Sequence, residues 1–128
     1  MSKIIFDASA LIALFAKEEG YLFIKKHMKD AVISSVNIAE VYKYCIEVQG
    51  LQKDDVETVI KLSDIKIIDF CHDQALISAR IIHKTKAHGI SLEDIACIAL
   101  AIFKNYPILT CDKIWKKPEL DVQFIMAR

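Results

Sequence analysis

The sequence predicts an α/β fold, a three-layer sandwich in which a five-stranded parallel sheet is flanked by helices. Short, strongly apolar segments alternate along the chain with longer helical segments, as expected when crossover helices cover both faces of a parallel sheet. Gly20, Gly50 and Gly89 each follow a helical segment, where a left-handed C-cap residue is common. The 128 residues contain no linker, repeat or low-complexity tract, so we expect one domain over residues 1–128.

The strands are predicted from short apolar runs rich in β-branched residues. In chain order they are Lys3–Phe6, Ala31–Ser34, Ile65–Phe70, Pro107–Thr110 and Val122–Met126. The helices are predicted from residue propensity, apolar patterning and stop signals such as the segment KEEG. In chain order they are Ala8–Glu18, Tyr21–Lys29, Val36–Gln49, Lys53–Leu62, His72–His88 and Ser91–Asn105.

Asp7 lies where the first strand meets the first helix, in the segment IIFDASALIALF. One interpretation is an N-cap, whose carboxylate accepts hydrogen bonds from the first turn of the helix. The other is a site residue at the carboxyl end of a strand, where open α/β sheets bind ligands. Asp7 alone does not decide between the two.

Three further acids occupy comparable places. Glu40 lies early in the helix after the second strand, and Asp94 lies in the first turn of the helix that Ser91 is predicted to cap. Asp112 follows the fourth strand. Each has an ordinary explanation by itself: a solvent-exposed glutamate, a capping-box residue and an Asx-turn.

Taken together, the four acids point to a metal site, because a parallel sheet brings strand ends and helix starts to one edge. Clustered carboxylates raise one another's pKa unless a cation neutralises them. Oxygen donors without His or Cys suit Mg²⁺ or Mn²⁺. A site of this kind that is open to water can activate a water molecule for cleavage of a phosphodiester bond.

Composition narrows the function further. The 17 basic and 17 acidic side chains give a net charge of zero, so nucleic-acid binding must depend on local patches. Four cysteines without CxxC spacing indicate free thiols in the cytoplasm and not a disulfide framework. The longest apolar run, Ile95–Phe103, is too short to span a bilayer, and the N-terminus does not resemble a secretory signal. We therefore expect a cytoplasmic protein without membrane contact.

Four segments, taken together, resemble the PIN domain, and more closely the VapC-type toxins of bacterial toxin–antitoxin pairs. They are DASALIAL, SSVNIAEV, SLEDIACIALA and LTCDKIW, and the resemblance runs from Lys3 to about Phe124. It implies a Mg²⁺- or Mn²⁺-dependent endoribonuclease that acts on RNA as the toxin of a type II pair. It also implies a homodimer and a cognate antitoxin protein.

The resemblance assigns roles position by position. The family's four catalytic, metal-binding acids match Asp7, Glu40, Asp94 and Asp112, with Glu40 binding the metal directly or through water. Ser9 and Thr110 match the hydroxyl residues that line the family's pocket, and Asn37 lies where a supporting polar residue is often found.

The chain departs from some relatives just after Asp112, where they carry a further acid. Here Lys113, Lys116 and Lys117 follow, so whether one or two metal ions bind stays open. These lysines are candidates to guide RNA toward the acids, although an ordinary solvated face is the alternative.

Two other functions stay open at this point. A phospho-receiver domain has this length and sheet type, but it needs paired acids after the first strand. Asp69 inside a predicted strand and Lys113 directly after Asp112 also fit it poorly. A catalytically idle, PIN-like RNA-binding module is the second alternative, and metal-dependent RNA cleavage would distinguish it.

Five apolar side chains in the first two helices exceed what a small core obviously needs. They are Leu11, Leu14, Phe15, Leu22 and Phe23. We predict that they form a dimer or antitoxin surface, since large apolar patches are rarely left bare. The alternative is that they all belong to the core.

Overall fold

A parallel sheet forms the centre of the fold. The computed structural model describes residues 2–113 and 120–128, and within them the strand order is β3-β2-β1-β4-β5 with every pair parallel. The strands are β1 Ile4–Phe6, β2 Ala31–Ser34, β3 Lys66–Ile68, β4 Ile108–Thr110 and β5 Phe124–Met126. The predicted five-stranded parallel sheet flanked by helices is confirmed.

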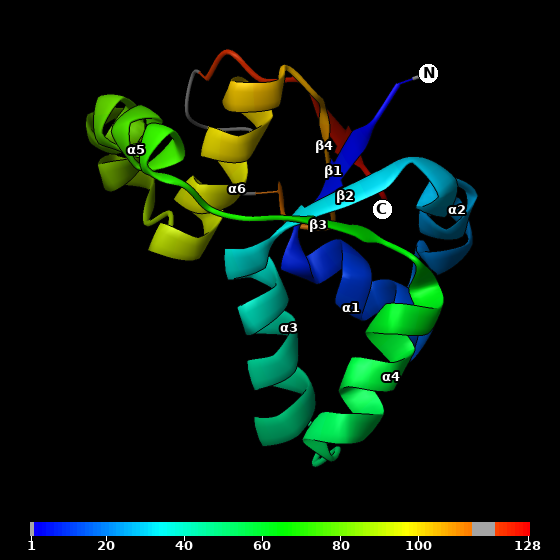
Figure 1. The fold of residues 1–128 in the computed structure, drawn as a ribbon. Coiled ribbons are helices and arrows are strands. Elements are labelled where there is room, and N and C mark those ends of the chain that lie inside the picture. The colour runs from blue at the N-terminus through cyan, green and yellow to red at the C-terminus, as the bar shows by residue number, and fades with distance from the viewer. Residues whose placement is uncertain (1, 114–119) are drawn as a thin grey trace.

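Helices cover both faces of the sheet (Figure 1). Helices α5 and α6 lie on one face, and α1 to α4 lie on the other. Their bounds are α1 Ala8–Ala16, α2 Tyr21–Lys26, α3 Ser35–Glu47, α4 Lys53–Ser63, α5 His72–Thr85 and α6 Leu92–Lys104. Two short 3₁₀ helices, η1 Met28–Asp30 and η2 Lys86–His88, precede β2 and α6.

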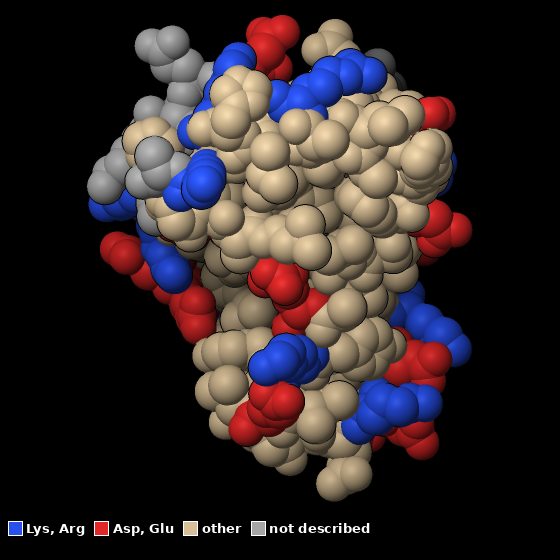
Figure 2. Space-filling view, turned by 90° about the vertical axis from the view of Figure 1, so that its left-hand side faces the viewer, with Lys and Arg blue, Asp and Glu red and all other residues tan. Residues whose placement is uncertain are grey.

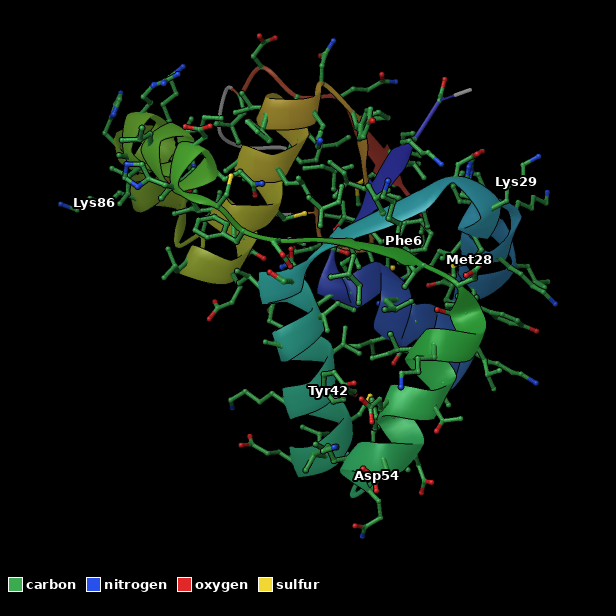
Figure 3. All side chains as sticks on the ribbon, in the orientation of Figure 1. Phe6, Met28, Lys29, Tyr42, Asp54 and Lys86 are labelled. Carbon is green, nitrogen blue, oxygen red and sulfur yellow. The ribbon has the colours of Figure 1, made fainter. Side chains whose placement is uncertain are left out.

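The strand side chains alternate between two cores, as the two-residue period of a strand requires. Ile4 and Phe6 of β1 pack with residues of α1, α3 and α4, and Phe6 lies at the middle of the sheet in Figure 3. Ile5 packs on the opposite face with residues of α5 and α6. Both faces of β1 are therefore buried, which explains its uninterrupted apolar sequence.

The predicted strands are all present, and Ala31–Ser34 is correct at both ends. The third strand ends at Ile68, so the prediction that it continues to Phe70 was wrong. As an edge strand, β3 pairs only with β2, and it has no partner once β2 ends at Ser34 and α3 begins. The last strand is shorter than predicted for the same reason, because β5 pairs only with the three residues of β4.

Two predicted helices ended too late, because α2 and α5 give way to the 3₁₀ helices η1 and η2. The role predicted for Gly20 was also wrong. Lys17, with φ 53°, is the left-handed residue that ends α1, whereas Gly20, with φ 91°, is the N-cap of α2. A Cβ atom at Gly20 would lie 2.5 Å from the Ala127 carbonyl oxygen, so this position requires glycine.

The predicted apolar surface is divided between core and exterior. Leu11 is fully buried in the core, so its assignment to an interaction surface was wrong. Leu14 and Phe15 are half-buried at a pocket beside α3 and α4, and Leu22 and Phe23 of α2 are exposed. In the described part of the chain, no helix has the length and apolar character needed to cross a membrane. The four cysteines are free thiols, as predicted.

Candidate active site

Asp7 is at once a helix cap and a buried acid at the edge of the sheet. Its backbone is extended and continues the pairing of β1 with β4, because its N–H donates to the Leu109 carbonyl oxygen at 3.3 Å. Its Oδ1 accepts from the Ala10 N–H at 2.9 Å, which caps α1. Only 3% of Asp7 is exposed. The capping interpretation of Asp7 is therefore confirmed, and its place at the carboxyl end of β1 is the one that the site interpretation requires.

Two hydroxyl groups hold the Asp7 carboxylate in place. The Ser9 hydroxyl donates to it, with Oγ 2.7 Å from Oδ1, and the Thr110 hydroxyl donates to Oδ2. Ser9 Oγ also accepts from the Cys111 N–H at 3.1 Å, so the start of α1 is bonded to the end of β4. Ser9 and Thr110 thus lie beside the acid, where the resemblance assigned them.

Asp112 is brought to the same edge by its main chain. Its N–H donates to Thr110 Oγ1 at 2.9 Å, so a hydroxyl closes the turn that follows β4. The Asp112 side chain is half-buried. The same Thr110 hydroxyl therefore contacts Asp7 through its proton and Asp112 through its lone pair.

Glu40 comes to the site from α3, which begins directly after β2 with Ser34 as its N-cap. Glu40 is half-buried, so its simplest sequence interpretation, an exposed glutamate, was wrong. The side-chain amide of Asn37 explains this orientation. It donates to Glu40 Oε1 at 2.7 Å and to the Glu93 carbonyl oxygen at 3.1 Å, which ties α3 to the first turn of α6.

Asp94 lies in the first turn of α6, as predicted. Its N–H donates to Ser91 Oγ at 3.1 Å, so the capping interpretation is confirmed for the main chain. The Asp94 carboxylate also acts on the other acids, because its negative charge raises the pKa values of both Asp7 and Glu40. Asp94 is therefore near both of them.

Burial and neighbouring negative charge both raise the pKa values of acids at this edge. Burial raises the pKa of Asp7 to about 6, against the opposing hydrogen bonds from Thr110, Ser9 and Ala10, with repulsion by Asp94 added. Burial raises the pKa of Glu40 to about 7, against the Asn37 hydrogen bond. Repulsion by Asp94, Glu93 and Asp7 raises it further. Three acids from β1, α3 and α6 therefore share one electrostatic environment.

Glu93 is the residue that the sequence analysis did not assign to the site. It adds charge beside Glu40, and its carbonyl oxygen accepts the Asn37 bond. It also lines a shallow pocket together with Glu40 and Lys43. In the space-filling view, acidic side chains gather around a hollow where the α5–α6 side of the molecule meets α3 (Figure 2). The adjacent acids in SLEDIA were the signal for it.

The lysines that were predicted to guide RNA follow Asp112 in the sequence. Lys113 is exposed, next to Asp112, whereas Lys116 and Lys117 lie outside the described residues. Lys29 and Lys86 point away from opposite sides of the molecule (Figure 3).

The donor set suits a hard cation even though the acids are not arranged as a chelate. Across residues 2–113 and 120–128, no three Asp, Glu, His or Cys side chains form a group that could hold a metal ion. The side chains near one another at this edge nevertheless supply carboxylate oxygens, which Mg²⁺ and Mn²⁺ prefer. Repulsion from neighbouring acids contributes to the raised pKa values of Asp7 and Glu40, and a bound cation would relieve it.

The fold and its acidic edge are those of a class of α/β domains that bind ligands at the carboxyl ends of parallel strands. Comparison with protein-family models identifies the family. The sequence model of the PIN domain matches residues 4–119, which is most of the chain. The chain belongs to the PIN domain family. The comparison with curated proteins gives no match.

Several solved structures share the fold. DNA-bound VapBC from Salmonella typhimurium is similar with a TM-score of 0.77 at 14% identity, covering 100% of both chains. A toxin–antitoxin complex from Klebsiella pneumoniae gives 0.72 at 20% identity, covering 98% of each chain. Mycobacterium tuberculosis VapC20, described as a toxin that cleaves the sarcin-ricin loop, gives 0.71 at 15% identity, covering 94% of this chain and 99% of VapC20.

Proposed function

We propose that this protein is a metal-dependent endoribonuclease and the toxin of a type II toxin–antitoxin pair, acting in the cytoplasm. The observation that carries the proposal is the mutual repulsion of Asp7, Glu40 and Asp94, which come from three different elements. Crowded acids at the carboxyl edge of a parallel sheet suit a cation-assisted hydrolytic site. Membership of the PIN family and the RNA-cleaving description of VapC20 support the same activity.

Each residue has a role that follows from its environment. Asp7, Asp94 and Asp112 would hold Mg²⁺ or Mn²⁺, with Glu40 binding directly or through water. The bound cation would supply a Lewis acid that stabilises charge on the phosphate and lowers the pKa of a water molecule. Glu40, held by the Asn37 amide at the border of the site, would accept a proton from the attacking water.

The hydrogen-bonded groups orient these acids. Ser9 and Thr110 fix both oxygens of Asp7, so that its carboxylate keeps one rotamer while the charge around it changes. The N-terminal turn of α6 contributes a positive dipole end beside Asp94, which favours an approaching phosphate group.

Cation binding can be tested without any RNA substrate. Mg²⁺ or Mn²⁺ should raise the melting temperature, since a ligand at a hundredfold excess over its dissociation constant contributes ~2.7 kcal/mol. A variant with all four acids changed to amides, Asp7→Asn, Glu40→Gln, Asp94→Asn and Asp112→Asn, should show no rise. Equal shifts in both proteins would remove the metal assignment.

Cleavage itself is tested on short single-stranded and stem-loop RNAs with Mn²⁺, Mg²⁺ or EDTA. Cleavage that needs the cation and is absent from the four-amide variant is the expected result. Binding without cleavage would favour the idle module. Labelling by a small phosphodonor, with no RNA cleavage, would favour the receiver alternative.

The antitoxin partner is proposed from the fold and from an apolar pocket. The similar structures include VapBC and another toxin–antitoxin complex. In this chain, a pocket of about 470 Å³ between α1, α3 and α4 is lined by Leu14, Phe15 and Val59, among others. We propose that an apolar segment of the antitoxin fills it and that the toxin is a homodimer. Co-expression with the product of a neighbouring small gene should give a complex that Val59→Asp weakens. A complex that Val59→Asp leaves unchanged would exclude this pocket as the binding site of the antitoxin.

A further inference from the structure

Asn37 joins α3 and α6, the two helices that carry Glu40 and Asp94. Its single amide nitrogen donates to Glu40 Oε1 at 2.7 Å within α3 and to the Glu93 carbonyl oxygen at 3.1 Å in α6. Asn37 itself is fully buried. These two bonds connect a carboxylate to the main chain of the turn that holds Asp94.

The oxygen of the same side chain indicates that Asn37 does more than pack. Asn37 Oδ1 is buried and has no hydrogen-bond partner among the described residues. A buried acceptor without a donor is unfavourable, and an apolar side chain of the same branched shape, such as leucine, would avoid that penalty. Unlike leucine, the Asn37 amide can donate the two hydrogen bonds to α3 and α6.

We propose that Asn37 is a positioning residue that couples α3 to α6 and so fixes Glu40 relative to the first turn of α6. The inference deepens the proposed nuclease function and depends on it for its catalytic consequence. Asp94 and Glu93 both repel Glu40, and this repulsion acts to separate the two helix starts. The Asn37 amide opposes this separation by neutral donor bonds and adds no charge to the site.

Gln74 of α5 provides a matched control within the same chain. It is also a buried amide, its Nε2 donates to one main-chain carbonyl oxygen, that of Asp69, at 3.1 Å, and its Oε1 is likewise unpaired. The bond partner of this amide, Asp69, is not an acid of the site. Asn37→Leu and Gln74→Met each replace a buried amide by an apolar side chain, leucine with the branching of asparagine and methionine with the length of glutamine. Asn37→Ala removes the amide without the added volume of leucine.

The first measurement needs no RNA and no metal. Asn37→Leu, and in parallel Asn37→Ala, should accelerate hydrogen exchange at the Asp94 and Ile95 amides by about tenfold or more, as expected when the hydrogen bond that holds the Glu93 carbonyl oxygen is lost. Gln74→Met should leave these two amides unchanged. The second measurement is RNA cleavage, where the Asn37 variants should lower kcat by about tenfold or more with KM altered less than threefold. Gln74→Met should change neither constant.

These results separate the inference from the proposed function. Faster exchange only in the Asn37 variants supports the coupling even if the wild-type protein cleaves no RNA, in which case the nuclease proposal alone fails. Unchanged exchange at Asp94 and Ile95, or equal acceleration by Gln74→Met, would overturn the coupling. Failure of both Asn37 variants to fold, while Gln74→Met folds, would also overturn it in favour of a general packing role.

Discussion

The hydroxyl of Thr110 connects Asp7 to the strand beside it. Thr110 Oγ1 donates to Asp7 Oδ2 and accepts from the Asp112 N–H at 2.9 Å. The parallel pairing of β1 with β4, in which Phe6 lies opposite Leu109, places Asp7 opposite Thr110 at the end of both strands. One buried hydroxyl thus orders two acids that are more than a hundred residues apart in the sequence.

We predict that Thr110→Val, which keeps the shape but removes the hydroxyl, weakens both stability and activity. Loss of buried hydrogen bonds should lower the free energy of unfolding by ~1–3 kcal/mol. Thr110→Ser retains the hydroxyl and should recover most of the RNA cleavage. Denaturant unfolding and cleavage rates measure the two effects, and equal rates for the Val and Ser variants would show that the hydroxyl is dispensable.

Removing one negative charge from the acidic edge should abolish cleavage without weakening the fold. Asp7→Asn keeps an oxygen for the Ala10 N–H, since asparagine is as good an N-cap as aspartate. Asp94→Asn leaves the Ser91 cap intact. Both variants relieve repulsion, so without metal they should melt at the wild-type temperature or above. A loss of ~0.5–2 kcal/mol, the value of a cap, would mean that capping is the main role of the residue changed.

Stability without metal should fall as pH rises from about 4 to 7. The folded-state pKa values of Asp7 and Glu40, about 6 and about 7, lie above their ordinary values of 3.8 and 4.5. In that window the folded protein binds more protons than the unfolded chain, so raising the pH favours unfolding. Melting curves at several pH values should show a smaller slope for Asp7→Asn combined with Glu40→Gln. Identical pH dependence in both proteins would contradict this assignment.

Gly20→Ala should be clearly more destabilising than Gly50→Ala. Both positions have positive φ, 91° and 69°, so an alanine is strained at each, by roughly 1–2 kcal/mol. Only at Gly20 would the new Cβ meet backbone, 2.5 Å from the Ala127 carbonyl oxygen, whereas nothing lies near Gly50. The difference in unfolding free energy between the two variants therefore measures the contact of the C-terminal segment with this turn. Equal losses of unfolding free energy in the two variants would show that the C-terminal segment around Ala127 moves to make room for the new Cβ atom.

The lysines after Asp112 are predicted to guide RNA. Each lysine that contacts a phosphate should contribute about −0.7 to the slope of log binding constant against log salt concentration. Lys113→Ala, Lys116→Ala and Lys117→Ala, each in a catalytically inactive background, should therefore flatten the slope if the residue contacts RNA. Lys61→Ala is a suitable control, because Lys61 is exposed near the end of α4, which leads to the opposite edge of the sheet. Unaltered slopes in all three would turn attention to Lys84 and Lys86.

Local pattern explains which parts of the fold could be predicted from sequence. β1 and β2 are buried on both faces, so their apolar runs predict them well, and Ser91 predicts the start of α6 because a cap is a local interaction. The ends of β3 and β5 were not predictable, since an edge strand continues only as far as its single partner. The two 3₁₀ helices and the left-handed conformation of Lys17 likewise depend on tertiary packing, which the local sequence does not specify.

The sequence by itself determined which acids are candidates for the site and at which edge of the sheet they lie. Local patterns of apolar and capping residues indicate where strands end and helices begin. Only the tertiary structure decided how the acids are held. The Thr110 bond to Asp7 follows from the register of β1 with β4, and the Asn37 bond to the Glu93 carbonyl oxygen follows from the packing of α3 on α6. Both bonds join residues far apart in the chain, and no local propensity specifies such partners. The raised pKa values of Asp7 and Glu40 have the same origin, since burial and neighbouring charge exist only once the chain is folded.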